Sequence, residues 1–337
     1  MGSVKDLEIV ESPSKENTGR GIFHFSDRYS VFDWGEMPVA IDGKGKVLAT
    51  MGAYTFEMLE ENGIETHYVG MEEGGEAKKL EDLSEPSDTM HIELVNVVKP
   101  EFINGKYVYP EITGSDLHNY LIPLEVIFRN TIPIGSSARR RYSPEELGLP
   151  YNKWPEEAVE LKDPIVESST KLEEQDRYIE DEEAEGISGV DLDEIYKVAD
   201  RVNEIITRRA DQAGLRHDDG KIELLYIDGD VVVGDVAGTF DENRFSYEGL
   251  QVSKEVLRQG YKETQPGWVE EVKEAKERAK KEGIKDWKSI VEEDPRRLGI
   301  EDLVSEMYKA GANLYMGVNM FEARDLEEVM NEIRSNF

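Results

Sequence analysis

The chain of 337 residues contains no cysteine, which excludes disulfide bonds and thiolate metal sites. It has five histidines, and none of them forms a His-x-x-x-His or Glu-x-x-His pair, so a zinc hydrolase is not expected. No apolar run approaches the roughly 20 residues that span a membrane, and the first residues lead into charge rather than an apolar signal core. We therefore expect a soluble, cytoplasmic protein with no membrane partner.

Basic residues are also scarce. The chain has 40 Lys and Arg against 73 Asp and Glu, a formal net charge of -33. Such a surface repels nucleic acid, so no nucleic-acid partner is expected. Two explanations of the acidity stay open: adaptation to a salty, halophile-like cytoplasm, where salt screens the self-repulsion, or an acidic protein of an ordinary cytoplasm. In either case an anionic substrate needs a local group of basic residues.

Apolar spacing and turn signals predict a coarse secondary structure. Extended segments are predicted at 20–33, 91–99, 124–128, 221–227 and 231–236, and helices at 46–62, 191–213, 268–282 and 303–318. The polar residues 71–88 are expected to form a surface loop, and the charged residues 160–187 an irregular segment. Because strands and helices mix without regular β-α-β alternation, an α+β fold is favoured over a doubly wound sheet.

Two common nucleotide-binding motifs are missing from the sequence. There is no Gly-x-x-x-x-Gly-Lys-Ser/Thr and no Gly-x-Gly-x-x-Gly after a strand, so P-loop and Rossmann proteins are disfavoured. One glycine-rich turn, Gly19-Arg20-Gly21, precedes an extended segment. A turn of this kind can bring backbone N–H groups close to a phosphate. Two glycines in a turn are more often a turn and nothing else, so this motif alone carries little weight.

Basic residues concentrate in the segment 129–141, which has four arginines and no acid. Arg129 ends a predicted strand, where an arginine can hold a phosphate with two parallel charge-assisted hydrogen bonds, and Ser136 adds a hydroxyl. This segment is a candidate for the local basic group that an anionic substrate needs. The alternative is a solubilising or oligomer-facing loop, and the sequence leaves a homo-oligomer open.

Carboxylates gather around a predicted hairpin. Lys221 and Glu223 lie on its first strand, Asp235 lies at the end of its second, and Asp228-Gly229 is the turn signal. Mg²⁺ prefers oxygen ligands and takes one or two carboxylates together with nucleotide phosphates. Glu223 and Asp235 are therefore the candidate metal ligands, and Lys221 is the candidate to neutralise phosphates.

The register of this hairpin tests the metal hypothesis. A two-residue turn at Asp228-Gly229 would pair Glu223 with Gly234 and point Glu223 and Asp235 to opposite faces. A three-residue loop or a bulge would bring the two acids opposite each other. The metal hypothesis therefore predicts an odd loop or a bulge, whereas an ordinary exposed hairpin would direct its acids to solvent.

A series of short elements, read in order from residue 19 to residue 317, resembles the SAICAR synthetase family. After the glycine turn they are Asp27-Arg28-x-Ser30-x-x-Asp33 with Lys44-Gly45, Arg129 with Gly135-Ser136, Ser169-Thr170-Lys171-x-Glu173, Asp219-x-Lys221-x-Glu223 with Gly234-Asp235, Asp241-x-x-Arg244, and Lys254-x-x-Leu257-Arg258. No single element decides the resemblance. Their common order and compatible spacing do.

The resemblance implies a two-domain α+β fold. An N-terminal antiparallel sheet domain with the glycine loop is expected at 1–122, and a larger ATP-binding α+β domain at 123–337, with ATP in the cleft between them. The implied activity is the ATP-dependent ligation of carboxyaminoimidazole ribotide (CAIR) and L-aspartate to SAICAR, ADP and phosphate in de novo purine synthesis. A bare carboxylate is a poor electrophile, so the implied reaction passes through an acyl phosphate, with ATP and Mg²⁺ as cofactors.

The resemblance also assigns roles to residues. ATP is expected at Gly19, Arg20, Gly21, Lys221, Glu223 and Asp235, with Mg²⁺ at the last two. The substrates are expected at Arg129, Ser136, Asp241, Arg244, Asp27, Arg28 and Ser30. The catalytic candidates are Lys221, Asp219 and Lys171.

Some positions depart from the family pattern. Arg20 and Ile22 stand where the glycine loop often has its basic residues, Val236 replaces the acid that often follows the metal aspartate, and Gly220 replaces a bulky residue. A non-catalytic or altered-specificity ATP-binding paralogue is therefore the alternative function. A scaffolding protein is discounted, because the arginine segment and the acidic pair would then be coincidences.

Overall fold

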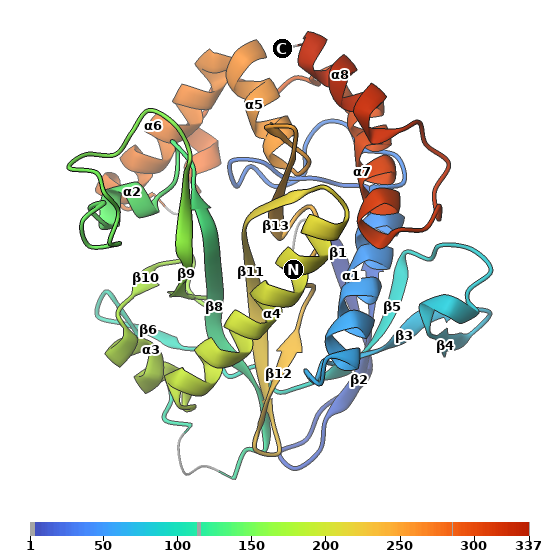
Figure 1. Ribbon diagram of the computed structural model, residues 1–337. Coiled ribbons are helices and arrows are strands. Elements are labelled where there is room, and N and C mark those ends of the chain that lie inside the picture. Colours follow the sequence, from blue (N-terminus) through green and yellow to red (C-terminus); the bar gives the residue numbers. More distant parts are fainter. Residues whose placement is uncertain (1–3, 113–115, 285, 337) are drawn as a thin grey trace.

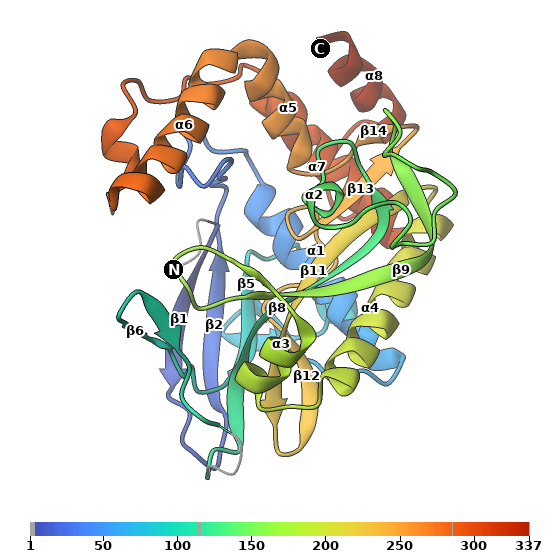
Figure 2. The same cartoon turned by 90° about the vertical axis from the view of Figure 1, so that its left-hand side faces the viewer.

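The computed structural model describes residues 4–112, 116–284 and 286–336. In this part of the chain the strands form a five-stranded sheet, a seven-stranded sheet and a two-stranded ribbon, with helices packed around them (Figures 1 and 2). The expected α+β class is confirmed. Among the described helices, none has the length and the apolar composition needed to cross a lipid bilayer.

The N-terminal sheet is antiparallel. In spatial order it consists of β1 (Lys5–Glu11), β2 (Gly19–Phe25), β5 (Thr89–Leu94), β3 (Tyr68–Glu73) and β4 (Glu76–Lys78). Along β2 buried and exposed residues alternate, so Phe23 and Phe25 face the core. Helix α1 (Lys44–Glu61), close to the predicted 46–62, packs against β2, β3 and β5 of this sheet with most of its side chains buried.

The larger sheet is built around two long strands. In spatial order its members are β10 (Tyr178–Ile179), β9 (Val159–Thr170), β8 (Asn119–Ile132), β11 (Arg216–Ile227), β13 (Asn243–Tyr247) and β14 (Leu250–Gln251), and β12 (Asp230–Gly234) pairs with β11. The ribbon consists of β6 (Glu101–Ile103) and β7 (Lys106–Val108). The border expected between residues 122 and 123 falls inside β8.

The helices that cover these sheets include the three predicted at 191–213, 268–282 and 303–318. Besides α1, the described helices are α2 (Ala138–Arg141), α3 (Asp181–Ser188), α4 (Leu192–Gln212), α5 (Glu255–Thr264), α6 (Pro266–Glu282), α7 (Glu301–Met316) and α8 (Leu326–Asn336), with short 3₁₀ turns η1 (Leu80–Asp82) and η2 (Trp287–Ile290). The Asp191 side chain caps α4 by accepting from the Asp193 N–H at 2.9 Å. Helix α4 crosses β8 and β11, while α5 and α6 lie beyond one end of the large sheet (Figures 1 and 2).

Three segments were predicted wrongly. The extended segment 20–33 ends early, because β2 stops at Phe25 and the backbone is left-handed at Phe32 and Asp33. Residues 71–88 are not one surface loop, because they include the β3–β4 hairpin and η1. Residues 160–187 are not irregular, because they form β9, β10 and α3. In β9 charged side chains stand at the exposed positions of a strand that β8 pairs along most of its length, so tertiary pairing outweighs the local composition.

Candidate active site

A cavity of about 780 Å³ opens between the two sheets, and both contribute to its walls. One wall is apolar and comes from the N-terminal sheet, with Leu7, Phe23, Ile92 and Leu94. The opposite wall is charged and comes mainly from the large sheet. Its ionisable residues include Lys171, Lys221, Glu223, Asp235, Glu242 and Lys254. A cavity of this size with an apolar face and a charged face suits a small organic anion that has a flat apolar part.

Strand β11 carries one row of functional side chains. Asp219, Lys221 and Glu223 lie at alternate positions, so they point to the same face of the strand. The residues between them pack the other way, and a Cβ at Gly220 would lie 2.0 Å from the Asn243 side chain. Glycine is therefore required there by close packing, which explains the departure from the bulky residue of the family pattern.

The β11–β12 hairpin has the two-residue turn Asp228-Gly229, and Glu223 pairs with Gly234. The predicted odd loop or bulge is wrong. The two acids nevertheless face the same cavity, because Asp235 lies just beyond the end of β12 and has a left-handed backbone, with φ of 53°. That conformation turns its side chain away from the direction that the strand pleat would give.

Ammonium groups neutralise both of these carboxylates. Lys5 Nζ lies 2.7 Å from Asp235 Oδ1, and Lys171 Nζ lies 2.6 Å from Glu223 Oε1. Among the described residues, no group of three or more His, Asp or Glu side chains is arranged around a common metal position. The donor set is therefore a pair of carboxylates with exchangeable cationic partners.

The pKa values in this pair move in opposite directions. Burial, followed by the nearby negative charge of Asp235, raises the pKa of Glu223. Burial also opposes the ionisation of Asp235, but the Lys5 ammonium outweighs it and lowers the pKa of Asp235. Asp235 is thus an anion near neutral pH, and Glu223 is the carboxyl whose charge responds to what occupies the site.

Lys221 completes the charged wall. Its ammonium lies 2.7 Å from Glu125 Oε1 and 3.4 Å from Glu242 Oε2. Burial disfavours its charge, yet the acids around it raise the pKa of Lys221 above its ordinary value. Lys171 shares Glu125, at 3.0 Å. The two lysines therefore stay protonated and are held side by side facing the cavity.

His67 holds the backbone of the metal candidate Asp235. Its Nε2 is 3.1 Å from the Asp235 carbonyl oxygen, and its backbone N–H donates to the Val233 carbonyl at 3.0 Å. Burial lowers the pKa of His67 to about 4, so the ring is neutral and Nε2–H is the donor to that carbonyl. This contact joins the segment before β3 of the N-terminal sheet to the residue that follows β12.

A second cluster lies at the other end of the β11 row. The sheet register aligns Asp219 with Arg129 on one side and Arg244 on the other. Asp219 Oδ2 accepts from Arg129 Nη1 at 3.2 Å, and Asp219 Oδ1 accepts from Arg244 Nε at 2.7 Å. Glu167 Oε2 accepts from Arg129 Nε at 2.7 Å. Asp219 therefore orients both arginines.

Two further groups surround this arginine cluster. Arg141 pairs with Glu167 at 2.7 Å and lies 3.5 Å from the centre of the Tyr178 ring. Ser136 is buried, and its hydroxyl accepts from the Ala138 N–H at 3.2 Å. The predicted basic segment therefore folds back on the strand that carries Arg129 and brings Arg141 to the cluster, whereas Arg139 donates to backbone carbonyls of Ile132 and Pro155.

The expected glycine turn is wrong. Gly19, Arg20 and Gly21 begin β2, and their residues pair with β1 on one side and β5 on the other. None of the three lines the cavity, and Arg20 is exposed and pairs with Glu11 at 3.0 Å. The glycines are explained by packing, since a Cβ at Gly19 would lie 2.2 Å from the Glu11 carbonyl oxygen.

Three predicted substrate residues have local structural contacts in the free chain, and their substrate contacts stay a prediction. Asp27 accepts from the backbone N–H groups of Gly43 and Gly45 at the start of α1. Arg28 pairs with Asp6 at 2.7 Å, and the Ser30 hydroxyl accepts from the Gly35 N–H at 3.1 Å. None of these three side chains lines the cavity.

Asp241 is also fully engaged. Its Oδ2 accepts from the buried Lys44 ammonium at 2.9 Å, and its Oδ1 accepts from the Tyr308 hydroxyl at 2.8 Å. The cationic partners, Lys44 foremost, lower the pKa of Asp241 against the effect of burial. This carboxylate joins α1 to α7 through Lys44 and Tyr308.

The SAICAR synthetase family model matches residues 10–275, which is most of the chain. The chain belongs to the SAICAR synthetase family. It is 41% identical over 345 aligned positions, covering 99% of both chains, to an Archaeoglobus fulgidus protein provisionally assigned as a phosphoribosylaminoimidazole-succinocarboxamide synthase. It is 29% identical to the phosphoribosylaminoimidazole-succinocarboxamide synthase of Thermoplasma acidophilum, over 86% of this chain and 91% of that one.

Solved structures agree with this assignment. A SAICAR synthetase in complex with ADP is 26% identical, with a TM-score of 0.53, over 77% of this chain and 88% of that one. The Saccharomyces cerevisiae SAICAR synthase complexed with SAICAR has a TM-score of 0.60 at 23% identity, which shows the shared fold, over 94% of this chain and 93% of that one. Membership of this family supports the function of a purine-biosynthesis ligase that makes SAICAR.

Sequence reasoning missed residues that the fold brings into the site. Lys5 reaches Asp235 from β1, 230 positions away, and Glu125 reaches Lys171 and Lys221 from β8. Glu125 had a local signal, because it stands four positions before Arg129 on one strand face. Lys5 had none, because its position depends on the meeting of the two sheets.

Proposed function

We propose that the chain is an ATP-dependent ligase that joins CAIR and L-aspartate to SAICAR, with ADP and phosphate as the other products. The observation that carries the proposal is the single row of Asp219, Lys221 and Glu223 on β11. It links a cavity with an apolar wall to an arginine cluster. The related SAICAR synthetase that was solved in complex with ADP supports a nucleotide site in such a fold.

The donor set fits Mg²⁺. Glu223 and Asp235 offer two carboxylates that face one cavity, and their present partners, the Lys5 and Lys171 ammonium groups, are cations that a divalent ion would replace. Mg²⁺ is usually held by one or two carboxylates plus substrate phosphates. When bound, it would supply charge neutralisation between the phosphates. Lys221, Lys171 and Lys5 would hold phosphate oxygens beside it.

The arginine cluster is the candidate site of the ribotide phosphate. Arg244 and Arg141 are the more accessible of its guanidinium groups, whereas Arg129 is almost fully buried between Glu167 and Asp219. Planar guanidinium groups suit the oxygens of a phosphate. Asp219 would act as a positioning residue, because it holds two of these arginines.

The proposed reaction has two chemical steps, phosphoryl transfer and amide formation. An oxygen of the CAIR carboxylate attacks the γ-phosphorus of ATP, the bond to the bridging oxygen breaks, and ADP leaves. The aspartate amine then attacks the acyl carbon, phosphate leaves, and the amine gives up a proton as the amide forms. Fixed charges would do most of the protein's work, by orienting the reactants and stabilising the charge that moves.

The alternative of a non-catalytic ATP-binding paralogue has less support from these residues. Arg20 and Ile22 lie in β2, outside the cavity lining, and close packing explains Gly220, which leaves Val236 as the remaining departure. The test is the release of ADP that depends on aspartate, with MgATP and CAIR present. Turnover that needs all three and falls at least about a hundredfold in Glu223→Gln, but not in the exposed Glu277→Gln control, is expected. Binding of MgATP without any turnover would refute the proposal.

A further inference from the structure

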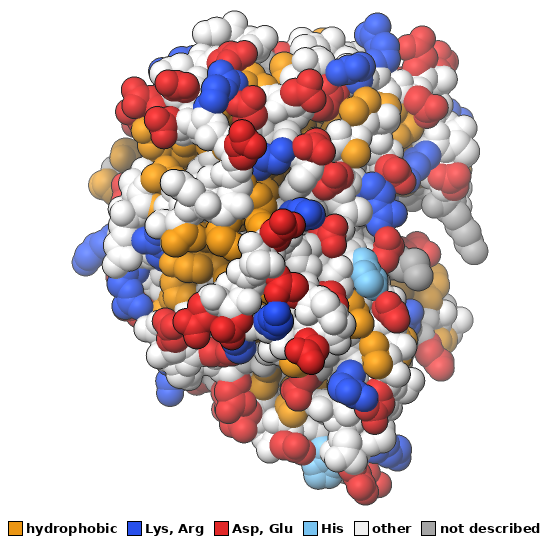
Figure 3. Space-filling view, turned by 90° about the vertical axis from the view of Figure 1, so that its right-hand side faces the viewer, with side chains coloured by type: hydrophobic (Ala, Val, Ile, Leu, Met, Phe, Trp, Pro, Cys, Tyr) orange, Lys and Arg blue, Asp and Glu red, His pale blue; other side chains and the backbone are white. Residues whose placement is uncertain are grey.

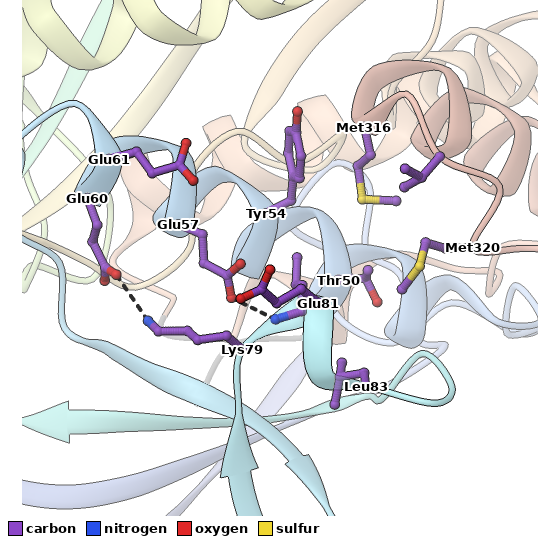
Figure 4. Close-up of a pocket in the computed structure, with 12 residues that line it drawn as sticks. Thr50, Tyr54, Glu57, Glu60, Glu61, Lys79, Glu81, Leu83, Met316 and Met320 are labelled. Carbon is purple, nitrogen blue, oxygen red and sulfur yellow. Dashed lines mark hydrogen bonds and ion pairs between the residues drawn. The ribbon is translucent and has the colours of Figure 1, made fainter.

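A second cavity, of about 640 Å³, lies away from the charged site and shares no lining residue with it. It is formed by one face of α1, the segment 79–83 and the end of α7 with the loop that follows (Figure 4). Figure 3 shows the side of the molecule on which these elements meet, with hydrophobic atoms bordered by acidic side chains. The volume is within the range of about 300–1,000 Å³ that small-molecule sites occupy.

The body of this cavity is apolar. Its apolar lining residues are Tyr54, Leu80, Leu83, Met316, Val318 and Met320. Methionine side chains are flexible and polarizable, so they adapt to ligands of different shape. A ligand that fills this volume therefore needs an apolar body.

The charged groups at the cavity are almost all acidic. Glu57, Glu60, Glu61 and Glu81 line it, against the single ammonium of Lys79. That ammonium is already used, because it pairs with Glu60 Oε2 at 3.0 Å and lies 4.3 Å from the centre of the Tyr68 ring. The remaining carboxylates exclude an anionic ligand and favour a cation.

Glu57 is a cavity carboxylate that is held in place by hydrogen bonds to its neighbours. Its Oε1 accepts twice, from the Tyr68 hydroxyl and from the Leu80 N–H, each at 2.9 Å. No residue of the described chain donates to its Oε2. Burial raises the pKa of Glu57 above its ordinary value. A half-buried carboxylate whose second oxygen is free to accept from a ligand is a position where a cationic donor would be stabilising.

An independent observation comes from α1 itself. Thr50 lines the cavity and is fully buried, and within residues 4–112, 116–284 and 286–336 its hydroxyl oxygen has no hydrogen-bond partner. In Figure 4 Thr50 lies in the same part of the cavity as Met320 and Leu83. A buried hydroxyl without a partner is costly, and a ligand that enters to this depth would satisfy it.

We infer that this cavity binds a small organic cation, a primary amine whose short apolar body carries a hydroxyl group at its other end. The ammonium would donate to Glu57 Oε2, the apolar body would pack on Tyr54 and Leu83, and the far hydroxyl would bond to the Thr50 hydroxyl. The inference is independent of the ligase activity, because none of these residues lies at the charged site. Its test can therefore fail while the proposed function stands, and the reverse.

Isothermal titration calorimetry of the full chain with three probes of equal length tests this site. Hexylamine is expected to bind about ten- to a hundredfold more tightly than hexan-1-ol, because a charge-assisted hydrogen bond replaces a neutral one. Hexanoate is expected not to bind. Glu57→Gln keeps the acceptor for Tyr68 and Leu80, so it should fold normally and lose the preference for the amine. Glu277→Gln, an exposed change on α6 with the same effect on net charge, should keep it.

A variant in which a larger side chain fills the cavity provides a second test of ligand binding. Leu83→Trp is expected to abolish the binding of both hexylamine and hexan-1-ol, because the larger side chain occupies the apolar body of the site. Three results would overturn the inference. They are no hexylamine binding by the unmodified chain, equal affinities in the Glu57 and Glu277 variants, and undiminished binding in Leu83→Trp.

Discussion

Lys5 and Arg20 give opposite predictions for nucleotide binding, although each replacement by methionine removes one positive charge. Arg20 belongs to the glycine motif that the family resemblance assigned to ATP. Lys5 lies in the charged cavity, 2.7 Å from Asp235, with its side chain 13% exposed. Arg20 is 70% exposed and pairs with Glu11 outside the cavity. Lys5→Met should therefore weaken MgATP binding, and Arg20→Met should not.

The magnitude follows from the environment of each charge. A hydrogen bond to a charged group contributes about 1.5–3 kcal/mol, and each 1.4 kcal/mol is a factor of ten in affinity. Loss of the Lys5 ammonium from a largely buried site should thus raise the MgATP dissociation constant about ten- to a hundredfold. Exposed pairs contribute about 0–1 kcal/mol and are screened by salt, so Arg20→Met should change the constant by less than about fivefold.

Calorimetric titration of each variant with MgATP, with CAIR and aspartate absent, measures the two constants directly. Thermal unfolding of the free variants checks that both are folded. The reasoning is refuted if Arg20→Met weakens binding as much as Lys5→Met, or if Lys5→Met binds MgATP like the unmodified chain. The first result would return the phosphate site to the start of β2, and the second would remove Lys5 from the site.

Three further predictions concern charge. Because the pKa of Glu223 is raised, this carboxyl keeps its proton at pH values above the ordinary glutamate pKa of about 4.3. MgATP affinity should therefore rise with pH above that value and become constant once Glu223 has ionised. The same pH dependence of MgATP affinity in Glu223→Gln would contradict this prediction. Lys44→Met should lower the free energy of unfolding in urea by about 3 kcal/mol, since it removes the nearest cation from the buried Asp241, which keeps only Tyr308 and the more distant Lys254. Lys309→Met, whose partner Asp42 is exposed, should cost less than about 1 kcal/mol. Equal costs would contradict a stabilising role of the buried Lys44–Asp241 ion pair. With 73 acidic and 40 basic residues, the melting temperature should rise as KCl is added, and a melting temperature that stays constant or falls would exclude halophile-like adaptation.

Alternation along a strand is a local property, and it was readable from the sequence. Asp219, Lys221 and Glu223 share a face whatever the rest of the fold does, provided that the segment is a strand. The Asp228-Gly229 turn was equally local. The side of the sheet on which Asp235 lies was not readable, because it depends on a left-handed backbone at one residue beyond the strand end. An aspartate tolerates that conformation better than most residues, but the pattern gives no sign that it adopts it.

The glycines and acids near the N-terminus show why a motif does not identify a role by itself. Close packing against Glu11 and Leu94 is sufficient to explain Gly19 and Gly21, and a phosphate contact there stays a prediction. Two hydrogen bonds of Asp27 hold the first turn of α1, and its contact with a substrate stays a prediction. These uses depend on which strand lies alongside and where a helix begins, and both are consequences of the tertiary fold.

The acidity of the chain and its proposed anionic substrates are compatible because the main cations of the site already have acidic partners. Lys5 and Asp235, Lys171 and Glu223, and Arg244 and Asp219 are paired before any ligand enters. Binding MgATP and a ribotide phosphate then exchanges one set of ion pairs for another, so little net charge is transferred into the low-dielectric cleft. Such exchange keeps the lysines and arginines protonated and oriented in the free protein, at the cost of some affinity. On this reasoning the acids that pair with the site cations are part of the binding machinery, and removing one of them should misplace its cation rather than free it for the phosphate.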